Sequence, residues 1–421
     1  MKILWITNIV FPEAQGLLKG DGSLKASGGW MLGAAEALAA KDNITLVVAT
    51  VSSDVKQLTK LKGERIEYYL IPYGRGNYKY NASYESYWKV IDDAVRPDVI
   101  HIHGSEYSHG LAYVRACGSK NVIVSIQGLV SVCSKYYCFG ITKKQILLNF
   151  TFRSLLGRGV LKEKKQFAKR GIWEHELINR VDNIIGRTSW DKTHAWAINP
   201  QAEYYHVGET LRDAFYDGEW SYSKCNPHSI FLSQGNYPLK GLHMVLMALP
   251  LILREYPDTT LKVAGKDITR CDSFKEFLSY TDYGRLIRNM IKKLSLEDVV
   301  SFTGPLDAEG MKEEYLKSNV FVCPSSIENS PNSLGEAQIL GVPVVAAYVG
   351  GVPDMMMGDE EHLYRFDEIE MMAKKICNVF EAGERQPQVA GMRDFAKRRH
   401  DPKSNCEELM SVYHNIYGAH D

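Results

Sequence analysis

The order of short apolar segments along the chain restricts its fold more than any other feature. These segments are rich in β-branched residues and form two series, separated by stretches of helical spacing. The first series lies at 2–10, 43–51, 97–104 and 121–128. The second series lies at 229–235, 260–265, 299–304, 319–325 and 342–347. Strands that alternate with helices in this way are typical of parallel sheets covered on both faces. We therefore expect an α/β protein with two doubly wound domains that face each other.

A polar segment, 207–227, separates the two series and carries glycine and proline, which favour turns and linkers. With 421 residues, the chain is also too long for one compact core. We predict an N-terminal Rossmann-like domain at 1–207 and a C-terminal one at 208–394.

The overall composition excludes several classes of protein. The chain is 45% hydrophobic and 24% charged, with 50 Lys and Arg against 50 Asp and Glu, so net charge gives no argument for nucleic acid as a partner. The first residues lack a secretory pattern, and no apolar run approaches the ~20 residues needed to cross a bilayer. Eight scattered cysteines in a chain of this size indicate reduced thiols. We expect a cytoplasmic protein.

One segment, 135–170, is strongly basic. It holds ten Lys and Arg residues against one acid, Glu163. Apolar residues lie between the charges: Ile146, Leu147, Leu148, Phe150, Phe152, Leu155 and Leu156. One interpretation is a solvated pair of helices. The other is an amphipathic surface that meets anionic lipid or a phosphorylated acceptor, as a peripheral contact at the inner face of the membrane.

The stretch IENSPNSLGEAQILGVPVVAA, at 327–347, sets Glu328 and Glu336 eight positions apart. Glu328 follows a predicted strand, in the position where open α/β sheets bind ligands. A helix is expected to begin near Ser333 and to end at Gly341. Glu336 would then be the third-position partner of Ser333 in a capping box, or a residue of a ligand site.

Gly335 favours the ligand site, because glycine is a poor helix former but lets a ligand approach the backbone. The amide groups of Asn332, Ser333 and Leu334 would face an anion at the start of the helix. Carboxylates repel phosphate, so the glutamates are expected to accept hydrogen bonds from sugar hydroxyls.

This pair of glutamates and the residues around it resemble the E-x7-E signature of the retaining GT-B glycosyltransferases of family 4, the glycosyl transferases group 1. Further similar motifs follow in the family's order: GG at 28–29, PDVIHIHG, LKG at 239–241, TLKVAGKD, SFTG, CPS and VGGVPDMM. The resemblance covers essentially the whole chain and is weakest between about 133 and 180. It also implies that the helical segment from about 395 to 421 crosses back onto the first domain.

The resemblance implies a role for each matching residue. Glu336 would bind the ribose of a nucleotide donor, and Glu328 the hydroxyls of the transferred sugar. The backbone from Asn332 to Leu334, with Ser333 between them, would contact sugar and phosphate.

Lys240 would neutralise the leaving diphosphate. Gly28 and Gly29 would let a helix N-terminus of the other domain approach the same group. Outside this context, Lys240 would be an exposed turn residue, and the two glycines a flexible loop.

Two positions depart from the family pattern. Gln234 stands where an arginine usually clamps the diphosphate, and an amide carries no charge. Gln127 stands where a histidine usually lies near the outer hydroxyls of the donor sugar. His103, at the end of the neighbouring strand, is either an active-site residue or a histidine packed at the sheet edge.

The expected function is transfer of a sugar, with retention, from a nucleotide-diphosphate sugar to a hydroxyl acceptor. A UDP-sugar is favoured because it is the commonest donor of the family. The chain contains no Asp-x-Asp pair to hold a metal-bridged diphosphate, so we predict a metal-independent reaction without cofactor. The acceptor, a sugar or lipid-linked sugar, is expected on the N-terminal domain, in the synthesis of surface polysaccharide or glycolipid.

Two alternatives have the same architecture. A nucleotide-sugar 2-epimerase would interconvert sugars without an acceptor. A non-catalytic sugar-nucleotide binder would be consistent with Gln234 and Gln127. The sequence leaves the donor base, the sugar, the acceptor and the oligomeric state open.

Overall fold

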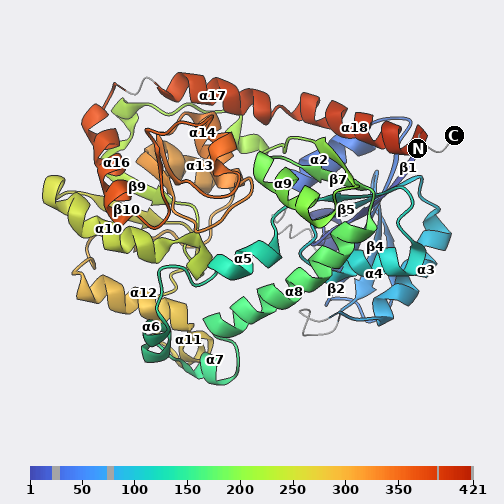
Figure 1. The fold of residues 1–421 in the computed structure, drawn as a ribbon, viewed down its shortest axis with the longest axis horizontal. Helices are drawn as coiled ribbons and strands as arrows, with labels where there is room; N and C mark the ends of the chain where they lie inside the picture. The colour runs from blue at the N-terminus through green and yellow to red at the C-terminus, as the bar shows by residue number, and fades with distance from the viewer. Residues whose placement is uncertain (21–28, 74–79, 386–387, 419–421) are drawn as a thin grey trace. The chain divides into compact units, whose positions relative to one another are not determined.

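The computed structural model describes residues 1–20, 29–73, 80–385 and 388–418. The chain divides into two compact units, each with its own sheet (Figure 1). Unit 1 comprises Met1–Val132, Phe167–Arg212 and Arg399–Asp421. Unit 2 comprises Cys133–Gln166 and Asp213–Arg398.

Within the described residues, the sheet of unit 1 has eight strands in the order β3-β4-β2-β1-β5-β6-β7-β8. Neighbouring strands are parallel, except for the antiparallel pair β3 and β4. The strands are β1 Lys2–Ile6, β2 Thr45–Ser52, β3 Thr59–Lys62, β4 Glu67–Pro72, β5 Val99–His103, β6 Val122–Ser125, β7 Asn183–Gly186 and β8 Glu203–His206.

The sheet of unit 2, over the same described part of the chain, has six parallel strands in the order β11-β10-β9-β12-β13-β14. The strands are β9 Asn226–Leu232, β10 Thr260–Val263, β11 Val300–Phe302, β12 Ser318–Cys323, β13 Val344–Ala347 and β14 Leu363–Tyr364. The central strands β12 and β13 are buried along their length and β9 is buried from Ser229 onward, as expected for a parallel sheet with both faces covered.

Helices connect the strands of both sheets. The helices of the first half are α1 Pro12–Lys19, α2 Gly29–Ala39, α3 Ser83–Val95, α4 Ser108–Cys117, α5 Val130–Tyr136, α6 Lys143–Leu148, α7 Phe152–Leu155, α8 Val160–Arg180 and α9 Ser189–Ile198. Those of the second half are α10 Leu242–Glu255, α11 Phe274–Ser279, α12 Asp282–Lys293, α13 Ala308–Lys317, α14 Asn332–Leu340, α15 Val352–Met355, α16 Ile369–Ala382, α17 Gln388–Arg399 and α18 Pro402–Gly418. Short 3₁₀ turns are η1 Asp213–Phe215, η2 Tyr222–Lys224 and η3 Pro238–Lys240. Among the helices that the structure describes, none combines the length and the apolar character of a membrane-spanning segment.

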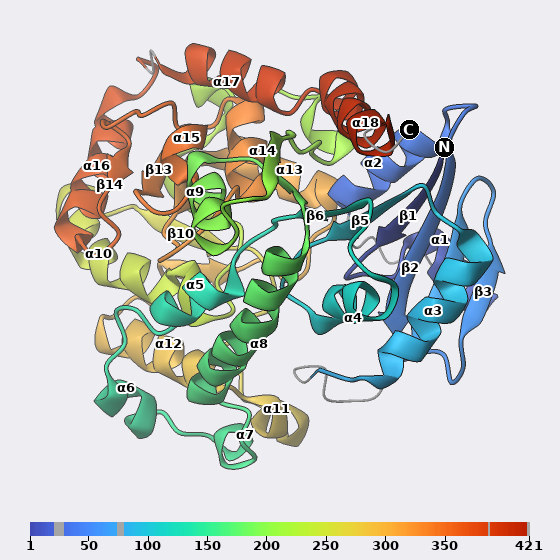
Figure 2. The ribbon, with the colours of Figure 1, turned by 45° about the vertical axis from the view of Figure 1, so that its right-hand side comes forward.

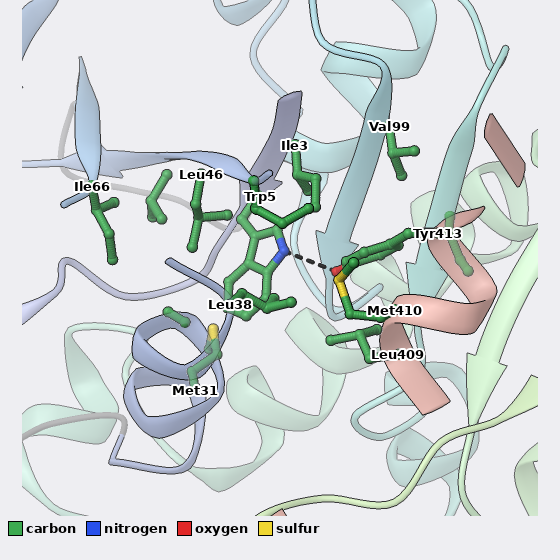
Figure 3. Packing of buried hydrophobic residues seen from close by; sticks show 14 of the residues in the cluster. Ile3, Trp5, Met31, Leu38, Leu46, Ile66, Val99, Leu409, Met410 and Tyr413 are labelled. Atoms are coloured by element: carbon green, nitrogen blue, oxygen red, sulfur yellow. Dashed lines mark hydrogen bonds between the residues drawn. The ribbon is translucent and has the colours of Figure 1, made fainter. Parts of the chain in front are cut away.

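The last helix, α18, is part of the core of unit 1. Tyr413 on α18 is fully buried, and its hydroxyl accepts a hydrogen bond from Trp5 Nε1 at 2.9 Å (Figure 3). The same hydroxyl lies 2.6 Å from His101 Nδ1, and His101 Nε2 lies 2.6 Å from Ser125 Oγ. Side chains from β1, β5, β6 and α18 thus form one buried hydrogen-bonded chain, which fixes the C-terminal helix against the sheet.

The division of the chain differs from the boundaries expected from the sequence, and the largest difference is at 133–166. Residues 133–166, expected with the N-terminal domain, lie in unit 2. Hydrogen bonds explain this placement: Asn289 Nδ2 donates to Asn149 Oδ1 at 2.7 Å, and Val160 N donates to Asp282 Oδ2 at 2.9 Å. The division therefore passes through α8.

Candidate functional site

The topology of unit 2 marks one position on its sheet. After β9 the chain proceeds outward to β10 and β11, and it then returns to place β12 on the other side of β9. Such a reversal of strand order leaves a crevice at the carboxyl ends of the two central strands, which is where open α/β sheets bind ligands. The segments that follow β9 and β12 contain Lys240 and Glu328.

Lys240 and Glu328 form an ion pair at this position. Lys240 Nζ lies 2.5 Å from Glu328 Oε1, which also accepts a hydrogen bond from Ser325 Oγ at 2.7 Å. The two side chains are only 20% and 14% exposed. Burial lowers the pKa of Lys240, but the nearby charge of Glu328 outweighs this effect, so the pKa is raised and the ammonium stays charged.

Close backbone packing fixes the turn that carries Lys240. Gly241 has a φ of +75°, and a Cβ at this residue would lie 2.0 Å from the carbonyl oxygen of Pro324. Ser326 N donates to Leu239 O at 2.9 Å and joins the same two segments. Only glycine meets both requirements at 241, so the LKG motif positions Lys240 beside the segment after β12.

The VGG segment holds the backbone of Glu328 from the other side. Gly351 N donates to Glu328 O at 3.1 Å. A Cβ at Gly350, whose φ is +52°, would overlap the same oxygen. Both partners of the ion pair therefore lie on segments with little freedom to move.

The helix α14 begins next to this pair, and its start differs from the capping-box interpretation. The helix begins at Asn332 with Pro331 as N-cap, and no side chain caps it. Ser333 is inside the helix, so Glu336 is not its capping partner. Glu336 is only 5% exposed, and Gly341 ends the helix with a φ of +81°, as predicted.

The amide groups at this helix start are partly used within the turn. Leu334 N donates to Pro331 O at 2.9 Å, so it does not face an anion in this structure. The amides of Asn332 and Ser333 lie in the first turn, where a helix offers no internal acceptor. Asn332 Oδ1 is buried and has no hydrogen-bond partner in the described part of the chain. The first turn of the helix that holds the buried Glu336 thus offers backbone N–H donors and one side-chain oxygen.

The remaining predicted donor residues are not part of this cluster. Gln234 is exposed, two residues after β9. Gly28 lies outside the described residues, and Gly29 is the first residue of α2 in unit 1.

His103 lies in unit 1 at the carboxyl end of β5, where that sheet also reverses its strand order next to β1. The ring is 4% exposed and lies 3.8 Å from the ring of His101 and 4.2 Å from that of Trp5. Burial, with the nearby His101 and Arg187, lowers the pKa of His103 well below its usual value. This environment is that of a neutral, packed histidine.

Gln127 follows β6 at the same edge and accepts a hydrogen bond from Arg187 Nη1 at 3.3 Å. Arg187 also pairs with Glu209, with 3.4 Å between Nη2 and Oε1, and both side chains are buried. Sequence reasoning missed Arg187 and Glu209. The signal that could have found Arg187 is the short apolar run NIIG directly before it, which is β7.

A second buried carboxylate lies at this edge of unit 1. Glu174 on α8 is fully buried and accepts hydrogen bonds from Val130 N at 2.8 Å and Ser131 N at 3.0 Å, at the start of α5. Burial raises the pKa of Glu174 to about 7. Arg170, the last basic residue of 135–170, is also buried, where Nε donates to Glu106 O at 2.7 Å. Arg170 is therefore not part of a basic surface.

No group of three His, Cys, Asp or Glu side chains in the described ranges has an arrangement that could hold a metal ion.

Comparisons with known proteins agree with this architecture. Residues 226–382 match the sequence family described as Glycosyl transferases group 1. The GDP-mannose-dependent alpha-(1-6)-phosphatidylinositol monomannoside mannosyltransferase of Mycolicibacterium smegmatis is 29% identical over 127 residues, which cover 28% of this chain and 30% of that protein. The chain spans less than half the length of the first curated relatives that it matches.

Solved structures match over nearly the whole chain. The sucrose-phosphate synthase of Thermosynechococcus elongatus superposes with a TM-score of 0.68 at 16% identity, over 99% of both chains. The Anabaena protein HepE in complex with UDP-glucose superposes with a TM-score of 0.63 at 16% identity, over 98% of this chain and 99% of that one. The fold is GT-B.

The GT-B fold confirms the expected class, an α/β protein with two parallel-sheet domains. Together with the match over 226–382, it supports the glycosyltransferase superfamily. The matched segment extends from β9 into α16 and contains Lys240, Glu328 and Glu336.

Proposed function

We propose that the chain is a retaining glycosyltransferase of family 4 that binds a nucleotide-diphosphate sugar on unit 2. One observation carries the proposal: the ion pair of Lys240 and Glu328 lies where the sheet reverses its strand order, next to the start of the helix that holds Glu336. This arrangement offers a cation, helix amides and two carboxylates, which are the groups needed for a diphosphate and its two sugars.

Each group has a separate task in this proposal. Lys240 and the amides of Asn332 and Ser333 bind the diphosphate and stabilise the charge that grows on it as it leaves. Glu336 accepts hydrogen bonds from the ribose, and Glu328 from the transferred sugar. In the free protein Glu328 holds the ammonium of Lys240 in place, so little reorganisation is needed when the phosphates arrive.

The reaction needs no protein nucleophile. The bond from the anomeric carbon to the diphosphate breaks while the acceptor oxygen bonds to the same carbon on the same face. The acceptor proton moves to an oxygen of the leaving diphosphate. We propose that the reaction is metal-independent, because Lys240 and the start of α14 supply the positive charge.

A UDP-sugar is the donor we favour. The support is the UDP-glucose complex of HepE, a protein with the same fold. The name of the mycobacterial relative specifies GDP-mannose instead, so the base must be determined by experiment.

We propose that the acceptor is a sugar or a lipid-linked sugar bound by unit 1, in the synthesis of surface polysaccharide or glycolipid. The polar groups at the carboxyl edge of that sheet, the buried Arg187 and Glu209 and the half-buried Gln127, support a binding edge there. The protein would then work in the cytoplasm, at the inner face of the membrane.

A thermal-shift panel of UDP, GDP, ADP and their sugars tests the donor site. One nucleotide should raise the melting temperature of the protein, and Glu336→Ala should abolish that rise. Glu297→Ala, an exposed glutamate of the same unit, is the control and should keep it. An unchanged shift in Glu336→Ala would remove Glu336 from the site.

Turnover assays test the reaction itself. Release of UDP should require an acceptor and should survive EDTA. Loss of most activity with EDTA would overturn the metal-independent mechanism. Interconversion of the donor sugar without acceptor would indicate an epimerase, and nucleotide binding without release a non-catalytic binder.

A further inference from the structure

Exposed apolar side chains gather on one part of unit 2. Leu148, Leu155 and Phe274 are 67%, 71% and 77% exposed, which is unusual for large apolar residues. We call the group formed by these and their exposed neighbours the apolar patch; it spans α6, the turn after it, α7 and α11. Its members are Leu147, Leu148, Phe150, Phe152, Leu155, Leu156, Phe274, Phe277 and Leu278.

Direct contacts join the segments of the apolar patch. The rings of Phe152 and Phe277 stack at 6.1 Å, which places α7 against α11. Arg285 Nη1 donates to Phe150 O at 2.9 Å and ties α12 to the turn between α6 and α7. In Figures 1 and 2, α7 lies beside α11 and α6 beside α12 in both views. The patch is therefore one surface built from two distant parts of the sequence.

The helices under the patch are well defined by their sequence. Capping boxes begin all three: Thr142 with Gln145, Thr151 with Ser154, and Ser273 with Glu276. In α6, Ile146 is buried while Leu147 and Leu148 point outward. The buried face of this short helix packs against the protein, but its outer face is also apolar. The outer face would be stabilised by contact with another apolar surface.

Basic residues surround the patch. Exposed Lys143 and Lys144 lie in the first turn of α6, and exposed Arg158 follows α7. Exposed Lys275, Arg285, Lys292 and Lys293 lie on α11 and α12. The acids nearby are fewer than these basic residues: Glu163, Asp272, Glu276 and Asp282. Three of them also accept hydrogen bonds from protein groups, Glu163 from the Tyr137 hydroxyl, Glu276 from the start of α11 and Asp282 from Val160 N. The electrostatic character of this surface is therefore positive.

We propose that the apolar patch and its basic rim dock unit 2 onto a membrane that contains anionic lipid. Leucine and phenylalanine side chains would enter the boundary between headgroups and acyl chains, while lysine and arginine would bind lipid phosphates. The helices are six, four and six residues long, so they lie in the membrane interface rather than cross it.

A second copy of the chain is a less suitable occupant. A symmetric contact through the patch would bring one basic rim against the other, and like charges repel. An anionic lipid surface satisfies the apolar and the basic residues together.

This inference deepens the proposed function, because a lipid-linked acceptor resides in such a membrane. The reason for docking on a membrane rests on the proposed function, whereas the docking surface itself does not. The patch is built by α6, α7, α11 and α12, and none of the proposed donor residues lies on these helices.

Vesicle flotation tests the docking surface with the full chain. The protein should float with vesicles of phosphatidylcholine and phosphatidylglycerol, and not with phosphatidylcholine alone. The variant Leu148→Ser/Leu155→Ser/Phe274→Ser should bind the anionic vesicles about tenfold more weakly or worse. The variant Lys143→Gln/Lys144→Gln/Lys275→Gln should also bind more weakly, and high salt should have the same effect.

Trp196→Ser is the matched control, since Trp196 is 64% exposed on α9 of unit 1. It should float as the unchanged protein does. Equal flotation of the apolar variant, or no flotation of the unchanged protein, would overturn the proposal. So would a dimer in light scattering that the apolar variant converts to a monomer.

The donor thermal shift separates this result from the proposed function. All variants of the patch should keep the nucleotide shift of the unchanged protein, which also shows that they are folded. Loss of flotation with the shift intact assigns the patch to docking. A protein that floats but shows no nucleotide shift would contradict the proposed function and leave the docking surface standing.

Discussion

Lys240 and Glu328 illustrate at the scale of single residues how a binding site is held ready. Each side chain is mostly buried, and the ammonium and the carboxylate lie within hydrogen-bonding distance of each other. Removal of one partner leaves the other charge buried without compensation. The pair should therefore matter for stability as well as for the donor.

We predict that Lys240→Met lowers the free energy of unfolding by about 1.5–3 kcal/mol, the usual size for a lost hydrogen bond to a charged group. Glu328→Gln should also destabilise the protein. The double variant should be less destabilised than the sum of the two, because neither charge is then left alone. Urea unfolding of the four proteins measures this coupling.

The exposed pair of Lys317 and Glu313 provides the comparison for this cycle. Its side chains are 51% and 64% exposed, so Lys317→Met should change stability by less than about 1 kcal/mol. Additive effects in the Lys240 and Glu328 cycle would show that the two residues do not interact in solution.

At the scale of elements, the turn between η3 and α10 determines where Lys240 lies. Gly241→Ala places a Cβ against Pro324 O and also strains a positive φ. We predict a loss of more than about 1 kcal/mol in unfolding free energy, together with a weaker donor thermal shift.

Gly358→Ala separates the two causes. Gly358 belongs to the same unit and has a similar φ of +72°, but a Cβ there would meet no atom within 4 Å. This variant should show only the cost of the backbone conformation and should keep the donor shift. Equal losses in both variants would mean that the contact with Pro324 does not position Lys240.

The same elements show what the sequence could predict. Several buried strands were predicted because a run of β-branched residues with both faces covered stands out, as in β2, β5 and β12. Strands β3, β4, β7, β8 and β14 were not predicted. The edge strands β3 and β14 have only four and two residues, which leaves little pattern to recognise. Glu328, Glu336 and Lys240 were found through their motifs, whereas Arg187 and Glu209 meet only when the chain folds.

The segment 133–166 shows the limit most clearly. Its helices and its basic, apolar composition were visible in the sequence. Its neighbours were not, because they are Phe277 and Arg285, more than a hundred positions away. Composition alone therefore could not show that α11 and α12 complete the same surface.

At the scale of the whole molecule, buried histidines contribute to the response to acid: four of them lie in unit 1, and His243, whose pKa burial lowers to about 4, lies in unit 2. Burial lowers the pKa of His101 to about 3 and those of His109 and His400 to about 4, and it lowers that of His103 well below its usual value. The unfolded chain takes up these protons first, at a pH of about 6.5. The contribution of these neutral histidines to the free energy of unfolding is thus fully present above that pH, and it is lost as the pH falls towards 4.

Glu174 acts in the opposite sense. Burial raises its pKa to about 7, so the folded state takes up this proton first. Its contribution to stability is complete below its usual pKa of about 4.5 and is lost as the pH rises through 7. The pKa of Glu106 is raised in the same direction by burial. Two carboxyl groups therefore offset part of the effect of four histidines.

We predict that the free energy of unfolding of unit 1 falls as the pH is lowered from 6.5 to 5. The fall should be up to about 1.4 kcal/mol per pH unit for each buried histidine whose effect is not offset by a carboxyl group with a raised pKa. Glu174→Gln removes one opposing group and should make this fall steeper, whatever its effect at neutral pH. Exposed Glu64→Gln should leave the slope unchanged. Urea unfolding followed by tryptophan fluorescence reports mainly on unit 1, which contains six of the seven tryptophans. Two results would contradict this prediction: an unfolding free energy that stays constant down to pH 5, or a flatter pH dependence in Glu174→Gln. Either would show that these groups have the same pKa values in the folded protein as in the unfolded chain.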